Sequence, residues 1–432
     1  SLVSPVDMPL DRGSAYALAR VEGSQLLALM RAAAALRDRH KGQIVSYSRK
    51  VFIPLANLCR NRCAYCAFAR SRAHPAAAIM PPDAVLAIAR AGAAQGCKEA
   101  LFCLGERPEA RYPAARRALA RLGYASTVAY LAAMCALVWR ETGLLPHCNS
   151  GVVDEEELAM LAEVSVSSGL MLESASERLC RPGGPHYRCP GKAPAVRLAT
   201  IAAAGRRRIP FTTGILVGIG ETPEERVDSL WAIKELHERY GHIQEVIVQN
   251  FQPHPGTPMA THPAPAALEM LRTLALARLI LGGEMNVQAP PNLAPDVYQL
   301  YPLAGSNDWG GISPVTRDLI NPGADWPEIA ALRRATTTAG FVLRERLAVY
   351  PEYLRRPGKP SRAGTGHGRS GDRPYSRSGA RGTGALLGRG CGPLPRARGR
   401  PHRPHACRRR AAPPDRRRSG HLRHCAQRQF HQ

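Results

Sequence analysis

Short apolar runs alternate along this chain with longer stretches in which apolar residues recur every three or four positions. The short runs are typical of buried strands, and the longer stretches are typical of helices that cover a sheet. The predicted strands are residues 50–55, 99–104, 146–152, 169–173, 211–217, 245–251, 286–289 and 309–313. The predicted helices are residues 24–39, 82–95, 114–121, 127–141, 154–163, 193–204, 223–240, 264–281 and 326–339. Strands and helices that alternate in this way indicate parallel β/α units.

The number of units decides the architecture. Eight β/α units predict an α/β fold of the (β/α)8 TIM-barrel type, and a six-unit partial barrel is the second choice. Residues 1–45 are predicted to be an N-terminal helical lead, and residues 46–354 to form the barrel. Residues 355–432 are rich in Arg, Gly and Pro and have no apolar periodicity, so we expect a disordered C-terminal tail.

The positive charge of the chain is concentrated in that tail. The 432 residues carry a formal net charge of +25, but residues 355–432 alone contain 21 basic and two acidic residues, which leaves +6 for the first 354. Such a tail could bind nucleic acid through phosphates, but Tyr375 and Phe430 are its only aromatic residues for stacking on bases, so nucleic acid is not the expected partner. An abundance of Arg, Gly, Pro and Ala with almost no Lys also fits a GC-rich gene that is read out of frame.

Cysteine content and hydropathy predict a cellular compartment. Residues 1–13 contain no apolar signal region, and the longest apolar run, residues 128–139, is too short to span a bilayer. A long chain of this kind with twelve cysteines is expected to be cytoplasmic and reduced, with no membrane partner. Its cysteines are then free to bind metal or to fill the core.

The most specific motif follows the first predicted strand. Cys59, Cys63 and Cys66 are spaced by three and then two residues, so three thiolates can hold one side of an iron–sulfur cube and leave its fourth iron open. An open position is typical of catalytic rather than structural metal sites. The alternatives are cysteines clustered by chance, or a zinc site whose only loose additional ligands would be Cys180, His186 and Cys189.

This motif, with Tyr65 before the last cysteine, resembles the signature of the radical S-adenosylmethionine (SAM) superfamily. The resemblance implies a [4Fe-4S] cluster whose open iron chelates the methionine part of SAM. An electron from the cluster would then split SAM into methionine and a 5′-deoxyadenosyl radical.

Three further motifs resemble parts of the SAM site in that superfamily. Gly105 and Glu106 resemble an element that contacts the methionine amino group, and Glu173 lies where a polar side chain often holds the ribose. The stretch from Gly214 through Leu216 and Gly218 matches a glycine pattern that lets the backbone approach the adenine. Without a ligand, Glu106 would be a solvated loop carboxylate and Glu173 the partner of a nearby Arg. All three motifs end predicted strands, where barrel active sites are built.

Amide and carboxylate side chains gather at the last three strand ends. Side-chain amides offer donor and acceptor together, as the edge of a pyrimidine requires. They could equally hold loops in place. The candidate substrate residues are Gln249, Asn250, Gln288, Asn292, Asn307 and Asp308.

Residues 46–354 as a whole resemble the CofG-type 7,8-didemethyl-8-hydroxy-5-deazariboflavin (FO) synthases and the N-terminal half of fused FO synthases. The stretches that carry this resemblance are residues 46–54, 96–102, 142–147, 209–214, 241–251 and 308–314. It implies a radical SAM lyase of coenzyme F-420 biosynthesis. The substrate would be the tyrosine–uracil adduct 5-amino-5-(4-hydroxybenzyl)-6-(D-ribitylimino)-5,6-dihydrouracil, supplied by a CofH-type partner enzyme, and ring closure would release ammonia. The cluster also requires a reductant.

Two alternatives to this function remain at the level of sequence. A related barrel enzyme, of the CofH or futalosine-cyclase type, would keep the fold and the cofactors but change the substrate. A nucleic-acid-binding protein would act through the Arg-rich tail. The sequence assigns no catalytic acid or base, and it predicts core or loop roles for the remaining thiols, Cys97, Cys103, Cys135, Cys148, Cys180 and Cys189.

Overall fold

The structure is a computed structural model that describes residues 10–70, 74 and 77–354. The predicted disordered tail at 355–432 and the first nine residues of the N-terminal lead lie outside the described residues. All elements below belong to the described part of the chain.

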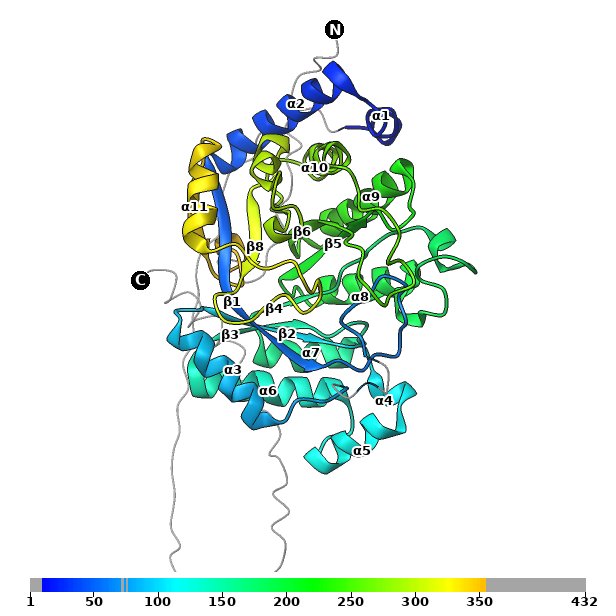
Figure 1. Ribbon diagram of the computed structural model, residues 1–432, viewed down its shortest axis with the longest axis vertical. Coiled ribbons are helices and arrows are strands. Elements are labelled where there is room, and N and C mark those ends of the chain that lie inside the picture. Colours follow the sequence, from blue (N-terminus) through cyan, green and yellow to red (C-terminus); the bar gives the residue numbers. More distant parts are fainter. Residues whose placement is uncertain (1–9, 71–73, 75–76, 355–432) are drawn as a thin grey trace, which may run out of the picture. The chain divides into compact units, whose positions relative to one another are not determined.

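Eight parallel strands form a closed barrel (Figure 1). They are β1 (Ile44–Ala56), β2 (Glu99–Leu104), β3 (Leu145–Asn149), β4 (Ser167–Gly169), β5 (Phe211–Val217), β6 (Ile243–Asn250), β7 (Val287–Gln288) and β8 (Asp308–Ile312). Each strand pairs with the next in chain order, and β1 pairs with both β2 and β8, which closes the ring. The predicted TIM-type barrel is confirmed, and a six-unit barrel is not what forms.

Helices cover the outside of the strands (Figure 1). They are α1 (Arg12–Leu18), α2 (Gly23–Lys41), α3 (Pro82–Ala94), α4 (Pro108–Arg111), α5 (Pro113–Leu122), α6 (Thr127–Thr142), α7 (Glu155–Val164), α8 (Pro194–Arg206), α9 (Pro223–Tyr240), α10 (Ala267–Leu281), α11 (Ile329–Thr338) and α12 (Pro351–Leu354). The sequence itself specifies some of the boundaries. The Thr222 hydroxyl caps α9 by accepting from the Glu225 N–H at 3.2 Å, while the Glu225 carboxylate accepts from the Thr222 N–H at 2.8 Å.

One helical stretch in the described residues, Pro113–Thr142, is long and apolar enough to cross a membrane by length and composition. Such a stretch is weak evidence, because core helices of other proteins pass the same test. Here the helix is interrupted between α5 and α6, where Gly123 adopts a left-handed conformation and the Ser126 hydroxyl caps α6. Helix α6 then buries Val128, Leu131 and Val138 in the hydrophobic core.

The strand predictions differ from the structure most in β1, β3, β4 and one further strand. Strand β1 begins at Ile44 and not at residue 50, and β3 ends at Asn149 and not at residue 152. Residues 169–173 were expected to be a strand, but β4 ends at Gly169, and Glu173 has a positive φ of 66° that does not fit a regular strand. A ninth strand, β9 (Val342–Arg346), was not predicted. It pairs in parallel with the first half of β1, and only two of its five residues are buried, so its pattern lacks the apolar run of a central strand.

The segment from β9 to α12 closes the barrel at the end where the strands begin. The carbonyl of Ala348 accepts hydrogen bonds from Ser167 on β4 and Gln244 on β6, both at 3.2 Å. Arg346 reaches into the barrel, where its guanidinium lies 2.6 Å from Glu245 and 2.6 Å from Asp308. All three charged side chains are buried.

This buried ion-pair network yields a stability prediction. Arg346→Met leaves Glu245 and Asp308 buried without their cation, which should lower the free energy of unfolding by about 3–5 kcal/mol. Arg344→Met is the matched control, because Arg344 is an exposed arginine two residues earlier in the same strand. Urea unfolding of both variants measures the difference. Equal stabilities would show that the network does not hold the barrel floor.

Candidate active site

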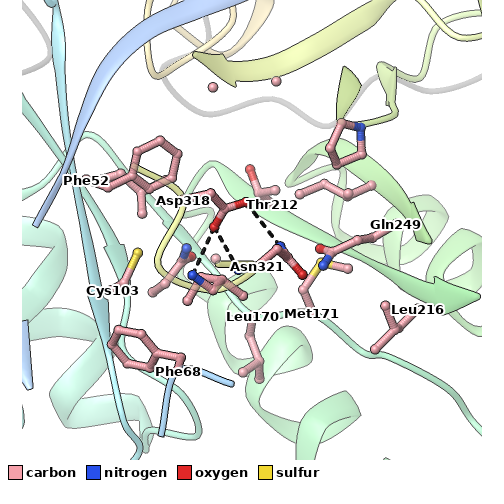
Figure 2. Close-up of a pocket in the computed structure, with 18 of the residues that line it drawn as sticks. Phe52, Phe68, Cys103, Leu170, Met171, Thr212, Leu216, Gln249, Asp318 and Asn321 are labelled. Atoms are coloured by element: carbon pink, nitrogen blue, oxygen red, sulfur yellow. Dashed lines mark hydrogen bonds between the residues drawn. The ribbon is translucent and has the colours of Figure 1, made fainter. Parts of the chain in front are cut away.

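A cavity of about 360 Å³ runs through the inside of the barrel. At one end lies the loop after β1 with the three cysteines of the motif, and at the other lie inward-facing residues near the starts of the strands, such as Glu99 and Arg346. The middle is largely apolar. Figure 2 shows Phe52, Phe68 and Cys103 on one side of the pocket and Leu216 and Gln249 on the other.

The cysteine loop is anchored at several points by its backbone. The Arg60 N–H donates to the carbonyl of Glu106 at 2.9 Å, and the Ala64 N–H donates to the carbonyl of Pro185 at 2.9 Å. Cys59, Cys63 and Cys66 all line the cavity. Two of their sulfurs accept backbone hydrogen bonds, Cys59 from the Glu106 N–H at 3.2 Å and Cys66 from the Ala69 N–H at 3.4 Å. The fold therefore brings the three predicted ligands to one site.

These thiols have the chemistry of metal ligands. Burial raises the pKa of Cys59 to about 11 and raises the pKa of Cys66 above its usual value. They therefore remain neutral until a metal ion displaces the proton. Among the described residues, no three Cys, His, Asp or Glu side chains converge closely enough to hold a single metal ion. A cubane cluster takes its thiolates at separate irons, so three thiols that share a cavity without converging fit a cluster better than one ion.

A fourth thiol, Cys189, lies beside the motif, and the sequence analysis named it only as a loose additional ligand of the zinc alternative. A hydrogen bond links the thiols of Cys63 and Cys189, and it raises the pKa of Cys63 while it lowers that of Cys189. The Cys189 sulfur also accepts from the Arg62 N–H at 3.3 Å. The other two ligands of the zinc alternative have different partners. His186 hydrogen-bonds the Tyr65 hydroxyl at 3.0 Å, and the Cys180 thiol donates to the Lys192 carbonyl oxygen at 3.9 Å.

Glu106 is held rigidly at the end of β2. One carboxylate oxygen accepts from Arg60 at 2.7 Å and from the Asn61 amide at 3.0 Å, and the other accepts from the Val152 N–H at 3.0 Å. Burial opposes its ionisation, but the Val152 N–H and the Arg60 guanidinium together lower the pKa of Glu106 below its usual value. It is 4% exposed, so it is not the solvated loop carboxylate of the alternative interpretation.

Three glycines make room for this arrangement. A methyl group on Gly105 would lie 2.0 Å from the Leu58 carbonyl oxygen, directly before Cys59. Methyl groups on Gly151 and Gly191 would lie 2.7 Å and 1.8 Å from atoms of the Glu106 side chain. The glycine of the Gly105–Glu106 element is therefore required by the close approach of two backbone segments.

Glu173 and Tyr65 belong to a second polar group in the cavity. The Glu173 carboxylate forms an ion pair of 2.5 Å with Lys192, whereas the alternative interpretation of this residue named an arginine as its partner. Burial opposes ionisation, but Lys192 and Arg197 lower the pKa of Glu173. The Lys192 ammonium also lies 5.8 Å from the centre of the Tyr65 ring.

The glycine pattern on β5 is only partly in the cavity. Leu216 lines it, whereas Gly214 and Gly218 are not among the lining residues. A methyl group on Gly214 would lie 2.1 Å from the Ile247 carbonyl oxygen of β6, and one on Gly218 would lie 2.7 Å from Pro265. In this structure these two glycines serve strand and loop packing.

The structure divides the six amide and carboxylate candidates. Gln249 and Gln288 line the cavity. The other four are not among the lining residues, and their side chains hold neighbouring segments. Asn250 donates to the Leu293 carbonyl, Asn292 donates to Asp318, Asn307 binds Arg278, and Asp308 binds Arg346.

Several cavity residues escaped the sequence analysis. They are polar or charged and line the cavity: Lys50, Glu99, His147, Thr212 and Glu245 on the barrel strands, and Arg346 at the end of β9. A signal for some of them was present, because Ser46, Ser48 and Lys50 are polar residues at alternate positions leading into an apolar run. Their inward direction became evident only when the barrel closed.

Comparison with known proteins defines the class. The sequence matches the family model of the Radical SAM superfamily over residues 53–230. The fold is similar to methylornithine synthase PylB, with a TM-score of 0.62 and 21% identity over 78% of this chain and 95% of that one. It is also similar to the FeFe-hydrogenase maturase HydG from Carboxydothermus hydrogenoformans, with a TM-score of 0.67 and 18% identity. That match covers 80% of this chain and 81% of the HydG chain. The fold, the cysteine site and the family match together define a radical SAM enzyme.

Similar sequences narrow the class. The chain is 54% identical over 313 residues to the 7,8-didemethyl-8-hydroxy-5-deazariboflavin synthase of Methanopyrus kandleri. The aligned region covers 72% of this chain and 93% of that protein. The chain therefore belongs to the 7,8-didemethyl-8-hydroxy-5-deazariboflavin synthase family. It is also 46% identical to the FO synthase of Streptomyces avermitilis over 81% of this chain, but spans only 42% of that longer protein.

The tight packing at Gly105 predicts the behaviour of a single variant. Gly105→Ala should displace the backbone before Cys59, and reconstitution should then yield less than one iron per chain instead of the roughly four of a cubane. Gly13→Ala is the control, because its methyl group would meet only Asp11 at 3.2 Å, far along the chain from the site. Iron analysis measures both. Full iron content in Gly105→Ala would show that the loop tolerates displacement.

Three buried histidines predict a pH dependence of stability. Burial lowers the pKa of His147 to about 4 and those of His186 and His242 to about 3, from 6.5. Below pH 6.5 the unfolded chain therefore binds protons that the folded protein does not. The free energy of unfolding should be greatest above this pH and fall as the pH falls toward 4. Urea midpoints between about pH 7 and 5 measure the slope, which His147→Gln should reduce. A flat profile would contradict the prediction.

Proposed function

We propose that this protein converts 5-amino-5-(4-hydroxybenzyl)-6-(D-ribitylimino)-5,6-dihydrouracil to 7,8-didemethyl-8-hydroxy-5-deazariboflavin. In this reaction the adduct closes its central ring and loses ammonia and two hydrogen atoms, and SAM is reduced to methionine and 5′-deoxyadenosine. The enzyme is thus an ammonia lyase and cyclase. The 54% identity to a named synthase over nearly its whole length supports the assignment, as does the cavity that the three thiols line.

Cys59, Cys63 and Cys66 would hold a [4Fe-4S] cluster in this cavity. When it is bound together with SAM, the cluster supplies the one-electron cleavage that generates a 5′-deoxyadenosyl radical. Glu106 is ionised and immobile, which suits it to accept a hydrogen bond from the methionine ammonium group. Glu173 remains available to ribose hydroxyls through the carboxylate oxygen that does not face Lys192.

In this proposal the apolar middle of the cavity binds the phenol ring of the substrate. Phe52, Phe68, Leu101 and Trp326 line it, and they offer a surface for the phenol ring of the adduct. Apolar side chains around the cavity also help to keep water away from reactive species. Gln249 also lines the cavity, and in this proposal its amide reads the imide edge of the uracil.

The proposal implies partners and a location. A CofH-type enzyme would supply the adduct, a cellular reductant would supply electrons, and the protein would act in the cytoplasm, where thiols stay reduced.

Anaerobic reconstitution followed by incubation with the adduct, SAM and a chemical reductant tests the function. We expect deazaflavin and 5′-deoxyadenosine in similar amounts, and no product from Cys63→Ala because the cluster loses a ligand. Cys97→Ala is the matched control, since Cys97 is a buried thiol that does not line the cavity.

The alternative substrates decide the outcome if no deazaflavin forms. Turnover of free tyrosine with 5-amino-6-(D-ribitylamino)uracil would indicate a CofH-type enzyme. No 5′-deoxyadenosine above background with the adduct would refute the proposed reaction.

A further inference from the structure

The floor of the cavity is a polar group that the proposed chemistry does not use. The Lys50 ammonium lies 2.9 Å from one oxygen of Glu99, and the Ser48 hydroxyl donates to the other at 2.5 Å. His147 on the neighbouring strand binds Ser167 through Nδ1 at 2.7 Å. Lys50, Glu99 and His147 are each less than 10% exposed, and all three line the cavity. We call them the floor triad.

Glycines on the surrounding strands create the space that these side chains occupy. A methyl group on Gly311 would lie 2.1 Å from Cε of Lys50, and one on Gly169 would lie 3.0 Å from Nε2 of His147. A methyl group on Gly310, whose φ is +75°, would lie 2.1 Å from the amide nitrogen of Gln288. The barrel thus lacks side chains at the positions where polar side chains cross its interior. Such an arrangement is expected of a built binding site, because a core needs no space for a buried lysine.

The floor retains unused hydrogen-bonding capacity. The Gln288 side-chain oxygen is buried and has no hydrogen-bond partner in the described part of the chain. Lys50 has three N–H donors, and the one hydrogen bond recorded for its ammonium in that part goes to Glu99. A buried polar atom without a partner costs free energy, and a ligand can recover that cost.

The charges of the floor exclude an anionic ligand. Lys50 is paired with Glu99, and Arg346 is shared between Glu245 and Asp308, so the cations are already neutralised. A phosphate or carboxylate placed here would face the carboxylates of Glu99 and Glu245 without a free cation. Donors and acceptors alternate instead, and a neutral hydroxyl group, which donates and accepts, matches such a pattern.

We propose that the floor triad and Gln288 bind the D-ribityl chain of the adduct as an unphosphorylated polyol. This inference rests on the proposed function. The ribityl carbons are not changed in the reaction, so they belong at the end of the cavity away from the cysteines, while the bonds that react lie toward the thiols. The floor triad then selects the substrate and sets its depth, which makes these side chains positioning and specificity-determining residues.

A comparison of three substrates on two enzymes tests the proposal. The substrates are the adduct, an analogue with N-methyl in place of N-ribityl, and the 5′-phosphate ester of the adduct. Wild-type kcat/KM should fall at least roughly 100-fold for each of the two analogues. Lys50→Met should lose about 10- to 100-fold on the adduct, the value of a hydrogen bond to a charged group, but little on the N-methyl analogue.

Controls separate binding from folding. Lys234→Met makes the same change at a mostly buried lysine of α9 outside the cavity, and it should leave the substrate ranking unchanged. Iron content and urea midpoints show whether Lys50→Met folds and holds its cluster. If it does not, Glu99→Gln, which keeps the side-chain shape, replaces it in the comparison.

The possible results distinguish failure of the ribityl assignment from failure of the proposed function. Equal losses for Lys50→Met on the adduct and on the N-methyl analogue would overturn the ribityl assignment while leaving the enzyme's function intact. Turnover of the phosphate ester as fast as the adduct would also overturn it. Absence of deazaflavin from wild-type enzyme and adduct would overturn the proposed function itself, together with the inference that rests on it.

Discussion

The pairing of β1 is the constraint on which the rest of the structure depends. This strand is hydrogen-bonded to β2, β8 and β9, so it closes the barrel and also joins the closing segment to it. Its far end leads into the cysteine loop, and its inward side chains include Lys50 at the floor. A slip of one residue would turn Lys50 outward and move Cys59 away from Glu106. One strand register therefore places both ends of the cavity.

The two ends of the cavity are stabilised by different kinds of interaction. At the cysteine end, backbone segments approach so closely that only glycine fits at Gly105 and Gly191, and Glu106 links the strand ends through hydrogen bonds to Arg60 and Val152. At the floor, charged side chains are paired in a space from which water is largely excluded. Buried pairs of this kind add little net stability over an apolar core. Their presence is better explained by a ligand than by the fold.

Much of the fold could be predicted from the sequence. Strands β2 and β5 and helix α9 have the predicted boundaries, because short runs rich in apolar and β-branched residues and a proline-containing capping box are local signals. The cysteine motif could be assigned for the same reason, since its ligands lie within eight residues. By contrast, β9 and the truncated β4 were missed. β9 is held by pairing with a strand some 300 residues away, and β4 ends where tertiary contacts impose an unusual backbone conformation at Glu173.

The sequence by itself determined the order of β/α units, the three cysteine ligands and the family, because each depends on residues near one another in the chain or on similarity along it. Only the tertiary structure decided which polar residues face the cavity. It assigned Asn250, Asn292, Asn307 and Asp308 to structural hydrogen bonds, and it brought Lys50, Glu99 and His147 together from three separate strands. The inward or outward direction of a strand residue depends on how the whole barrel closes, and no local pattern contains that information.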